Sequence, residues 1–468
     1  MKFAARYYQK EARIAFWDYI KSGKKAGLII IPTGGGKSFV IADIISRIRK
    51  KNKDATIMCV THSRELVAQN YNQLYNLAPE LILDMGVISG TLGNDIYKPI
   101  VFSTIQTLAA RLDKLKHRKD LLIIIDEAHR VPPESYTQYG QYLDFTRLQN
   151  PNVKFLGLTA TPFRMNNGLL ADGPIFDGVA YEIGLRPLIT QGYLVPPKTL
   201  WKGDGIAEDR LRKAGGDYSG GSHLDAYDID GGLEEIVSRA LEQIDADERK
   251  MCLWFLPSID TAMQTVEILE HNTRSAMAVT NDTPDRSNIL QLFKNGDIEH
   301  LVNVNILTTG YDNPSIDAII LLIATQSASK LVQIVGRGLR TAPGKTDCGI
   351  YDYGRNIERL GFIDQPNIDT RKKKIKVKKC PECSVYNRPN AQYCSACDFA
   401  FPPPASRSNP IRAGQDWTNM AHSDGIVSWD GEKWEVPPHE VEIEEISFTD
   451  WQKEGKTPSL RISFPKIF

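Results

Sequence analysis

The sequence lacks the long apolar segments that a membrane protein needs. No apolar run among its 468 residues approaches the about 18 residues of a membrane-spanning helix, and the N-terminal MKFAARYYQK has no apolar leader core. Net charge is also absent, because 57 Lys and Arg residues balance 57 Asp and Glu residues. A surface for a polyanion must therefore come from local clustering of basic side chains. These absences predict a cytoplasmic protein without membrane contact.

The chain is too long for one ordinary core, so two or three domains are expected. Short apolar runs alternate with helical patterns, and such runs are typical of strands buried on both faces of a parallel sheet. The pattern occurs twice, which predicts two tandem α/β domains. The runs are Leu28–Ile31, Thr56–Val60, Ile100–Phe102, Leu121–Ile125 and Phe155–Leu158, and then Cys252–Leu256, Ala276–Val279, Leu301–Val304 and Ala318–Ile323.

Other stretches depart from this pattern. The Gly- and Asp-rich stretch Lys202–Gly232 is predicted to be a loop or a small insertion. Strand-like alternation around Val441–Phe448 and Leu460–Phe464 predicts a small β-rich tail. The expected division is 1–190 for the first α/β domain, 191–368 for the second α/β domain, 369–403 for a basic linker with a small cysteine-containing module, and 404–468 for a linker and tail.

A glycine-rich loop follows the first apolar run. Ile31–Ser38 reads IPTGGGKS and leads into the amphipathic pattern Phe39–Arg49. Glycines let backbone N–H groups approach phosphates, while Lys37 can reach the β- and γ-phosphates and the Ser38 hydroxyl can coordinate Mg²⁺. The strict pattern has glycine where Ile31 stands, so a simple Gly-rich turn stays open. The candidate nucleotide-binding residues are Thr33, Gly34, Gly35, Gly36, Lys37 and Ser38.

An acidic pair follows the run Leu121–Ile125. Asp126–His129 reads DEAH, and an aspartate at a strand end can hold Mg²⁺ through its water shell. Glu127 can orient and deprotonate an attacking water. Such a pair is common by chance, but it stands about ninety residues after a phosphate loop, which favours hydrolysis of ATP with Mg²⁺.

Four of the seven cysteines form two CxxC pairs near the C-terminus. CPEC and CSAC stand ten residues apart, a spacing typical of two knuckles that close a tetrahedral Zn²⁺ site. The preceding run Arg371–Lys379 carries seven basic residues in nine, which indicates either a solvated linker or a phosphate contact. The predicted zinc ligands are Cys380, Cys383, Cys394 and Cys397, and the predicted buried, unreactive cysteines are Cys59, Cys252 and Cys348.

These motifs occur in the order found in one large family of nucleic-acid motors. Pro32–Ser38 and Asp126–His129 are similar to motifs I and II of superfamily 2 DNA helicases of the DEAH-box type, and Gln333–Arg340 (QIVGRGLR) is similar to motif VI. Within this superfamily the chain most resembles the bacterial RadD-type repair helicases, through LTATPFR, QIVGRGLRTAPGKTDC and the cysteine ribbon. Phage-type branch-migration helicases are also similar. The C-terminal region is shorter than in RadD-type proteins.

The resemblance implies two RecA-like parallel-sheet domains that close over ATP. Gln9 would read adenine, and Asp312 would contact the nucleotide. Arg337 and Arg340 are expected to share one face of a helix and to point at the γ-phosphate. The residues implied to act in catalysis are Lys37, Asp126, Glu127, Gln333, Arg337 and Arg340. Those implied to couple hydrolysis to movement are His129, Thr159 and Thr161, and those implied to contact a nucleic-acid strand are Ser63, Arg64, Ser103, Thr104, Gln106 and Thr308.

The implied function is an ATP-dependent DNA helicase or translocase that unwinds or remodels DNA in repair, recombination or replication. Single-stranded and branched DNA are the expected substrates, and a repair or single-strand-binding protein is the expected type of partner. Two alternatives stay open. The chain could be an RNA helicase, because DEAH occurs in that class too, or a recombination accessory protein whose binding of DNA and partners dominates over unwinding.

Overall fold

The computed structural model divides the chain into two compact units, Met1–Phe401 and Pro402–Phe468. No helix in the described part of the chain is long and apolar enough to cross a membrane. The residues that the structure describes are 4–89, 93–116, 118–163, 168–199, 205–214, 217–227, 232–304, 306–307, 311–363, 377–383, 385–394 and 397–402, and then 428–429, 434–435, 447–451 and 459–463.

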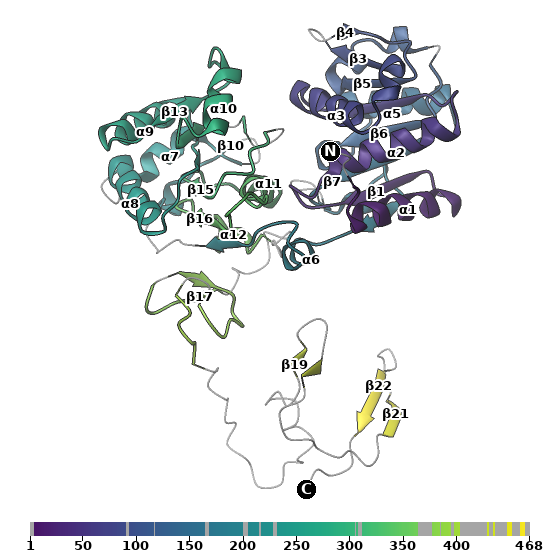
Figure 1. Ribbon diagram of the computed structural model, residues 1–468. Coiled ribbons are helices and arrows are strands. Elements are labelled where there is room, and N and C mark those ends of the chain that lie inside the picture. Colours follow the sequence, from purple (N-terminus) through teal and green to yellow (C-terminus); the bar gives the residue numbers. More distant parts are fainter. Residues whose placement is uncertain are drawn as a thin grey trace. The chain divides into compact units, whose positions relative to one another are not determined.

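The first unit begins with an eight-stranded sheet in the order β4-β3-β5-β2-β6-β7-β1-β8 (Figure 1). All neighbouring strands are parallel except β4, which is antiparallel to β3. Every residue of β1, β2, β5 and β6 is buried, as the continuous apolar runs predict. The strands are β1 (Ala26–Ile30), β2 (Ile57–Thr61), β3 (Met85–Ser89), β4 (Gly93–Asn94), β5 (Ile100–Thr104), β6 (Leu122–Asp126), β7 (Lys154–Thr159) and β8 (Gly178–Glu182).

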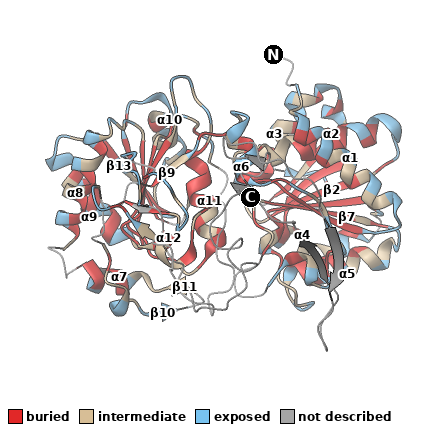
Figure 2. Cartoon of the chain, turned by 90° about the horizontal axis from the view of Figure 1, so that it is seen from below, coloured by how far each residue is buried: buried red, intermediate tan, exposed pale blue. Residues whose placement is uncertain are grey.

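Helices cover both faces of this sheet. Ile29 and Ile57 pack with helices α1, α2 and α3, whereas Leu28 and Met58 pack with α4 and α5, because successive strand residues point to opposite faces. Figure 2 shows the buried strands between the two helical layers. The helices are α1 (Tyr7–Lys21), α2 (Lys37–Lys51), α3 (Arg64–Leu77), α4 (Ile105–Ala109) and α5 (Gln138–Gln149). We call the sheet and these helices the first lobe, residues 4–184.

A second, six-stranded parallel sheet has the order β13-β14-β12-β15-β16-β9. With its helices it forms the second lobe, residues 197–363. The short helix α6 (Leu185–Thr190) joins the two lobes. The strands are β9 (Pro197–Thr199), β12 (Cys252–Phe255), β13 (Ala276–Val279), β14 (His300–Asn303), β15 (Ala318–Leu321) and β16 (Cys348–Tyr351), and the helices are α8 (Gly232–Ala246), α9 (Ile259–His271), α10 (Arg286–Asn295), α11 (Ala328–Gly338) and α12 (Asn356–Leu360). Two parallel sheets flanked by helices confirm the predicted α/β class.

The stretch predicted as a loop or a small insertion is a folded insertion where the structure describes it. A 3₁₀ turn (Glu208–Arg210) precedes the hairpin β10–β11 (Lys213–Ala214 and Asp217–Tyr218) and helix α7 (Gly220–Tyr227). Tyr227 is buried in the core of the second lobe and donates its hydroxyl to the backbone oxygen of Leu322. A plain loop would bury no such aromatic side chain, so that alternative is wrong.

The end of the chain contains short antiparallel strand pairs. In the first unit, β17 (Lys378–Lys379) pairs with β18 (Tyr386–Asn387) beside the cysteine pairs. In the second unit, β19 (Ser428–Trp429) pairs with β20 (Trp434–Glu435), and β21 (Ser447–Trp451) pairs with β22 (Ser459–Ser463). These pairs agree with the expected β-rich tail. Most of the basic run, residues 371–376, lies outside the described residues.

Candidate active site and metal centre

The glycine-rich loop connects β1 to α2 and has a left-handed backbone at two positions. Gly34 and Gly36 have φ values of 83° and 82°, which residues with a Cβ rarely adopt. Ile31 is fully buried, and a Cβ added at Gly35 would lie 2.4 Å from its Cγ2 atom. The isoleucine that replaces the usual first glycine therefore fills the space beside the loop, and Gly35 is the residue that makes room for it.

Helix α1 holds this loop from outside. The Tyr8 hydroxyl donates to Gly35 O at 2.7 Å, and Gln9 Nε2 donates to the same oxygen at 3.2 Å. Gln9 Oε1 accepts from Arg6 N at 2.9 Å, so the buried amide also caps α1. In this structure Gln9 braces the phosphate loop, and its expected contact with adenine stays a prediction.

The acidic pair lies at the carboxyl end of β6, facing the loop. Lys37 Nζ is 3.8 Å from Glu127 Oε1. Asn70 Nδ2 donates to Asp126 Oδ2 at 2.9 Å, and Gln69 Nε2 donates to Ser38 Oγ at 3.0 Å. Helix α3 thus orients both expected magnesium ligands through two amides. Asn70 was not singled out by the sequence, since a buried amide on an amphipathic helix carries no motif of its own.

The two carboxyl groups differ in pKa because they face different neighbours. Burial raises the pKa of Asp126 to about 6, and the adjacent charge of Glu127 adds to this effect. Burial also opposes ionisation of Glu127, but Lys37, His129 and Arg337 together lower its pKa. Glu127 is therefore held as a carboxylate, which is the form that a base needs.

The donor set fits a magnesium nucleotide. A cation beside the buried Asp126 carboxyl would favour its ionised form. Thr33 Oγ1 is buried and has no hydrogen-bond partner within the described part of the chain. An unpaired hydroxyl in a phosphate loop is suited to a ligand oxygen. The arrangement can thus hold ATP with Mg²⁺, with Lys37, Ser38 and Asp126 around the phosphates and metal.

His129 connects the acidic pair to the second lobe. Its Nδ1 atom lies 3.1 Å from Thr159 Oγ1, and Gln333 Nε2 lies 2.7 Å from its Nε2 atom. Because an amide nitrogen can only donate, His129 Nε2 accepts and its proton is on Nδ1. Burial lowers the pKa of His129 to about 4, in agreement with a neutral ring. His129 Nδ1 also lies 3.4 Å from Glu127 Oε2.

A second hydrogen bond crosses between the lobes close by. Thr161 Oγ1 lies 2.9 Å from Ser329 Oγ on α11, and both residues are buried. Thr159 Oγ1 donates to Thr161 O at 2.9 Å and accepts from Thr161 N at 3.1 Å. The three residues expected to couple hydrolysis to movement therefore form one hydrogen-bonded chain with α11.

The two arginines meet, although not on one helical face. Helix α11 ends at Gly338, so Arg337 lies in its last turn and Arg340 lies beyond it, which makes the expected shared face wrong. Both guanidinium groups donate to Tyr311 O, at 2.8 Å from Arg337 and 3.2 Å from Arg340. Arg340 also forms an ion pair with Asp312. Burial, with Arg340 nearby, lowers the pKa of Arg337 to about 9.

The end of α11 packs directly on the phosphate loop. A Cβ added at Gly336 would lie 2.5 Å from Thr33 Cβ, and a Cβ added at Gly34 would lie 3.2 Å from Arg340 Cγ. A side chain at Gly336 would force Thr33 and the loop away from α11, whereas one at Gly34 would require the Arg340 side chain to shift slightly. This close approach places the arginines beside the loop that is expected to hold the phosphates.

The side chains expected to contact a nucleic-acid strand are mostly engaged within the protein. Ser63 Oγ caps α3 through Leu66 N at 3.4 Å. Ser103 is fully buried, and its hydroxyl donates to Ile88 O at 2.7 Å. The Thr104 hydroxyl lies 2.9 Å from that of Thr107, and Gln106 donates to His62 O at 3.5 Å. Arg64 is exposed, and Thr308 lies outside the described residues. The strand-contact roles of all six stay predictions.

Two residues of the folded insertion hold the segment that enters α11, and the sequence did not indicate them. Asp217 accepts from Thr325 Oγ1 and Gln326 N, both at 2.8 Å. His223 is buried, and its Nε2 atom accepts from Ala324 N at 3.1 Å. These contacts join residues about 100 positions apart, and no local pattern reports such pairs.

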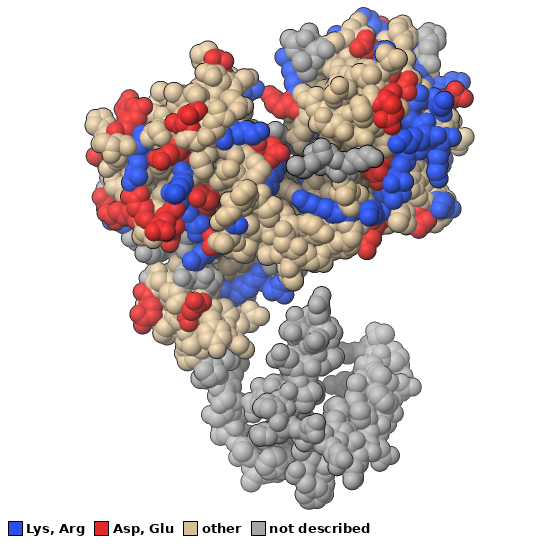
Figure 3. Space-filling view, in the orientation of Figure 1, with Lys and Arg blue, Asp and Glu red and all other residues tan. Residues whose placement is uncertain are grey.

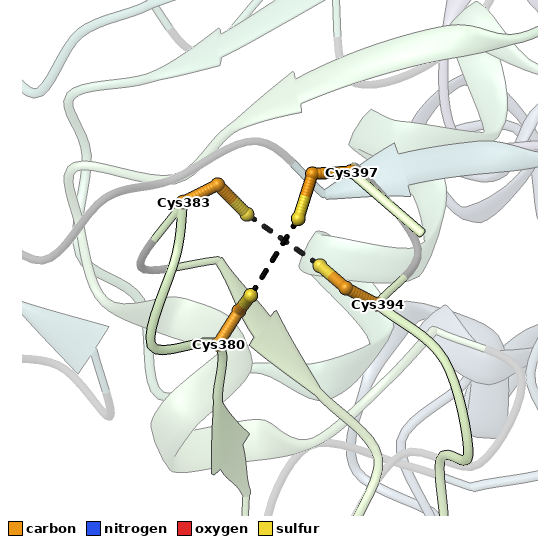
Figure 4. A group of neighbouring side chains, drawn as sticks. All are labelled: Cys380, Cys383, Cys394 and Cys397. Atoms are coloured by element: carbon orange, nitrogen blue, oxygen red, sulfur yellow. Dashed lines mark hydrogen bonds between the residues drawn. The ribbon is translucent and has the colours of Figure 1, made fainter. Parts of the chain in front are cut away.

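The four predicted metal ligands form a separate cluster (Figure 4). Their Sγ atoms all lie within 4.8 Å of one another, with 3.6 Å between Cys380 and Cys397 and 3.5 Å between Cys383 and Cys394. Zn–S bonds of about 2.3 Å in a tetrahedron imply S–S separations of roughly 3.8 Å. The cluster therefore fits a structural Zn²⁺ site. Asn387 Nδ2 donates to Cys394 Sγ at 3.5 Å, an outer contact of the kind that orients such ligands.

Two family models match consecutive parts of the chain. The model described as "Type III restriction enzyme, res subunit" matches residues 2–164, which contain the phosphate loop and the acidic pair. The model described as "Helicase conserved C-terminal domain" matches residues 234–342, which contain α11 and both arginines.

Individual proteins are similar over most of the chain. A protein named as the ATP-dependent helicase IRC3 of Saccharomyces cerevisiae is 30% identical over 78% of this chain and 53% of its own length. A protein named DNA 3'-5' translocase XPB2 of Sulfurisphaera tokodaii is 27% identical over 72% of this chain and 79% of its own length. A solved HsdR fragment of a type I restriction enzyme from Vibrio vulnificus has a TM-score of 0.60 at 21% identity, over 77% of this chain and 67% of that one. The chain spans about half the length of the yeast relative.

We predict that Asp217→Ala slows ATP hydrolysis without abolishing ATP binding. The substitution frees the segment before α11, and displacement of a catalytic group by about an ångström can cost up to ~100-fold in rate. We expect kcat to fall roughly tenfold while the KM for ATP changes little. Asp225→Ala is the matched control, since Asp225 lies in the same insertion but pairs with the exposed Arg212. Equal rates in both variants would exclude a positioning role for Asp217.

We predict that replacing Cys380 and Cys383 with Ser releases zinc, since two thiolates cannot close a tetrahedral structural site. The ribbon buries few apolar side chains and should unfold locally, whereas the two lobes keep their own cores. Metal analysis should find about one zinc per parental chain and none in the variant, with ATP affinity preserved. A variant that retains stoichiometric zinc would contradict this ligand set.

Proposed function

Since the chain belongs to helicase superfamily 2, we propose that it is an ATP-dependent DNA helicase or translocase of the DEAH-box type. Its task would be to unwind or remodel single-stranded and branched DNA during repair, recombination or replication. The RadD-type motifs support the repair assignment, and a repair or single-strand-binding protein is the kind of partner that we propose.

One observation carries the proposal: the hydrogen bond between Gln333 and His129, which joins the two lobes. His129 lies 3.4 Å from the carboxylate that would act as base, and Gln333 belongs to the other lobe. A bond of this kind makes the geometry around Glu127 depend on the position of the second lobe. Hydrolysis that requires closure of two lobes is what converts ATP turnover into movement.

Each residue of the site has its own role in the proposed hydrolysis of ATP. Lys37 would neutralise phosphate charge. Ser38 and Asp126 would hold Mg²⁺, and the bound ion would supply further positive charge at the phosphates. Glu127 accepts the proton of the attacking water. Arg337 and Arg340 approach from the second lobe, where an arginine stabilises charge that develops in phosphoryl transfer.

The choice of DNA over RNA rests on the relatives and on the ribbon. The archaeal relative is named a DNA translocase, and the cysteine ribbon follows the motor as in RadD-type proteins. An RNA helicase is the first alternative, and a recombination accessory protein with little unwinding is the second. ATPase and unwinding assays on single-stranded, duplex, forked and four-way DNA, with matched RNAs, distinguish the three. Stimulation by RNA alone would refute the DNA assignment.

We predict that Glu127→Gln retains ATP binding and loses turnover, because the amide keeps the size of the side chain but cannot accept a proton. The rate should fall by about 100-fold or more, in the range of general-base loss. Single-turnover ATP hydrolysis measures this, with Glu80→Gln as an exposed control that interrupts only a surface ion pair with Lys50. Hydrolysis at the parental rate would show that another group is the base.

We predict that Arg340→Ala lowers the hydrolysis rate far more than ATP affinity. The positive charge of Arg340 is needed when charge builds up on the transferred phosphoryl group, and arginines in this role contribute ~10³-fold. Binding of a fluorescent ATP analogue and steady-state ATPase rates separate the two effects. The control is Arg212→Ala, since Arg212 makes an exposed ion pair in the insertion. Equal losses in binding and rate would instead mark a ground-state contact.

A further inference from the structure

A cavity of about 300 Å³ lies where the zinc ribbon, helix α6 and the second lobe meet. It is separate from the phosphate loop and from the cysteine cluster, and the motor motifs supply none of its lining. Its walls come from three parts of the chain that are distant in sequence: α6 and the segment after it, the end of the second lobe with Phe362, and the ribbon with Arg388 and Tyr393.

The described lining residues combine apolar side chains with two arginines. Arg186 is exposed on α6, and no carboxylate is present among the described lining residues. The Arg388 guanidinium lies over the Phe362 ring, 5.4 Å from its centroid. Tyr393 is 63% exposed. Because the ring of a tyrosine is mostly apolar, this exposure places apolar surface in contact with water. Flat aromatic and guanidinium surfaces beside positive charge are suited to a planar, anionic ligand.

The zinc site fixes one wall of the cavity. Asn387 is buried, and its Nδ2 atom donates both to Cys394 Sγ at 3.5 Å and to Val385 O at 2.9 Å. Strand β18, which carries Asn387, pairs with Lys378 and Lys379, where the basic run ends. In Figure 3, Lys and Arg side chains gather between the ribbon, labelled β17 in Figure 1, and α6. A polyanion that follows these charges would reach the cavity.

Helix α6 has the cavity on one side and the phosphate loop on the other. Leu185, Arg186 and Ile189 line the cavity. A Cβ added at Gly35 would lie 3.4 Å from Leu188 Cδ1. Leu194, which follows α6, donates its backbone N–H to Leu188 O at 3.1 Å and forms a bridge with Arg340. One short helix therefore touches both sites.

We propose that this cavity binds an unstacked base of a single DNA strand, with Arg186 and Arg388 on the flanking phosphates and Tyr393 stacked on the base. This inference rests on the proposed function and adds a site outside the cleft between the lobes. The volume is at the lower end for small-ligand pockets, which suits one base rather than a folded ligand. Stacking and phosphate contact do not depend on base identity, so the site accepts any sequence.

The test compares Tyr393→Ala, Tyr393→Phe and Arg186→Glu in the chain of 468 residues. Base stacking contributes about 1–3 kcal/mol, so Tyr393→Ala should weaken binding of a thymidine oligonucleotide by about fivefold or more. Tyr393→Phe keeps the ring and should bind as the parent does, and Arg186→Glu should weaken binding most at low salt. Tyr97→Ala is the matched control, because Tyr97 is 90% exposed and lies far from the ribbon in sequence. Zinc content verifies that each ribbon is intact.

A crosslinking experiment provides a second readout. An oligonucleotide that contains 5-iodouracil, irradiated with the parental protein, should attach to the peptide that contains Tyr393. Parental affinity in both Tyr393→Ala and Arg186→Glu, with crosslinks only in the two lobes, would overturn the inference and leave the proposed function standing. Absence of binding to any DNA or RNA would overturn both. If an acidic peptide bound the parent and not Arg186→Glu, while DNA affinity stayed at the parental value in every variant, the cavity would be a peptide site and the inference would be wrong.

Discussion

The hydrogen bond between Gln333 and His129 is the contact on which the rest of the active site depends. It sets the tautomer of His129, which in turn directs the Nδ1 proton toward Thr159. Because Glu127 is nearly excluded from water, its charge is maintained by the cations Lys37 and Arg337 rather than by solvent. Loss of contact between the lobes would therefore change the protonation of the site as well as its shape.

Glycines make this contact between the lobes possible. The backbone at Gly336 lies so close to the Thr33 side chain that a Cβ there would clash, and Gly34 lies in tight contact with the Arg340 side chain. Within the phosphate loop, Gly35 must also lack a Cβ, because the side chain of the unusual Ile31 occupies the volume that a Cβ there would need. Such close packing does not tolerate added atoms. It therefore favours a small number of discrete arrangements of the two lobes over a continuous range of positions.

The sequence predicted the buried centre of the molecule better than its edges. Continuous apolar runs located β1, β2, β5 and β6, because strands covered on both faces need apolar side chains at every position. The strands β3, β4, β8, β9 and β16 were missed. At the edge of the first sheet, β8 contains polar residues that edge strands tolerate. The end of α11 before Arg340 and the contacts of Asp217 were missed for another reason. They follow from tertiary contacts that local periodicity does not encode.

The position of β9 constrains the order in which the chain can fold. All strands of the first sheet are complete by Glu182, so that lobe can acquire its core while the rest is still being synthesised. Strand β9 follows after helix α6, yet among the described residues it pairs with β16, whose Cys348 is the partner of Pro197 across about 150 intervening residues. During synthesis, strand β9 therefore stays unpaired beside the folded first lobe until β16 has been made. Strand β9 is three residues long and begins with proline. Both features make an unpaired strand edge a poor template for aggregation.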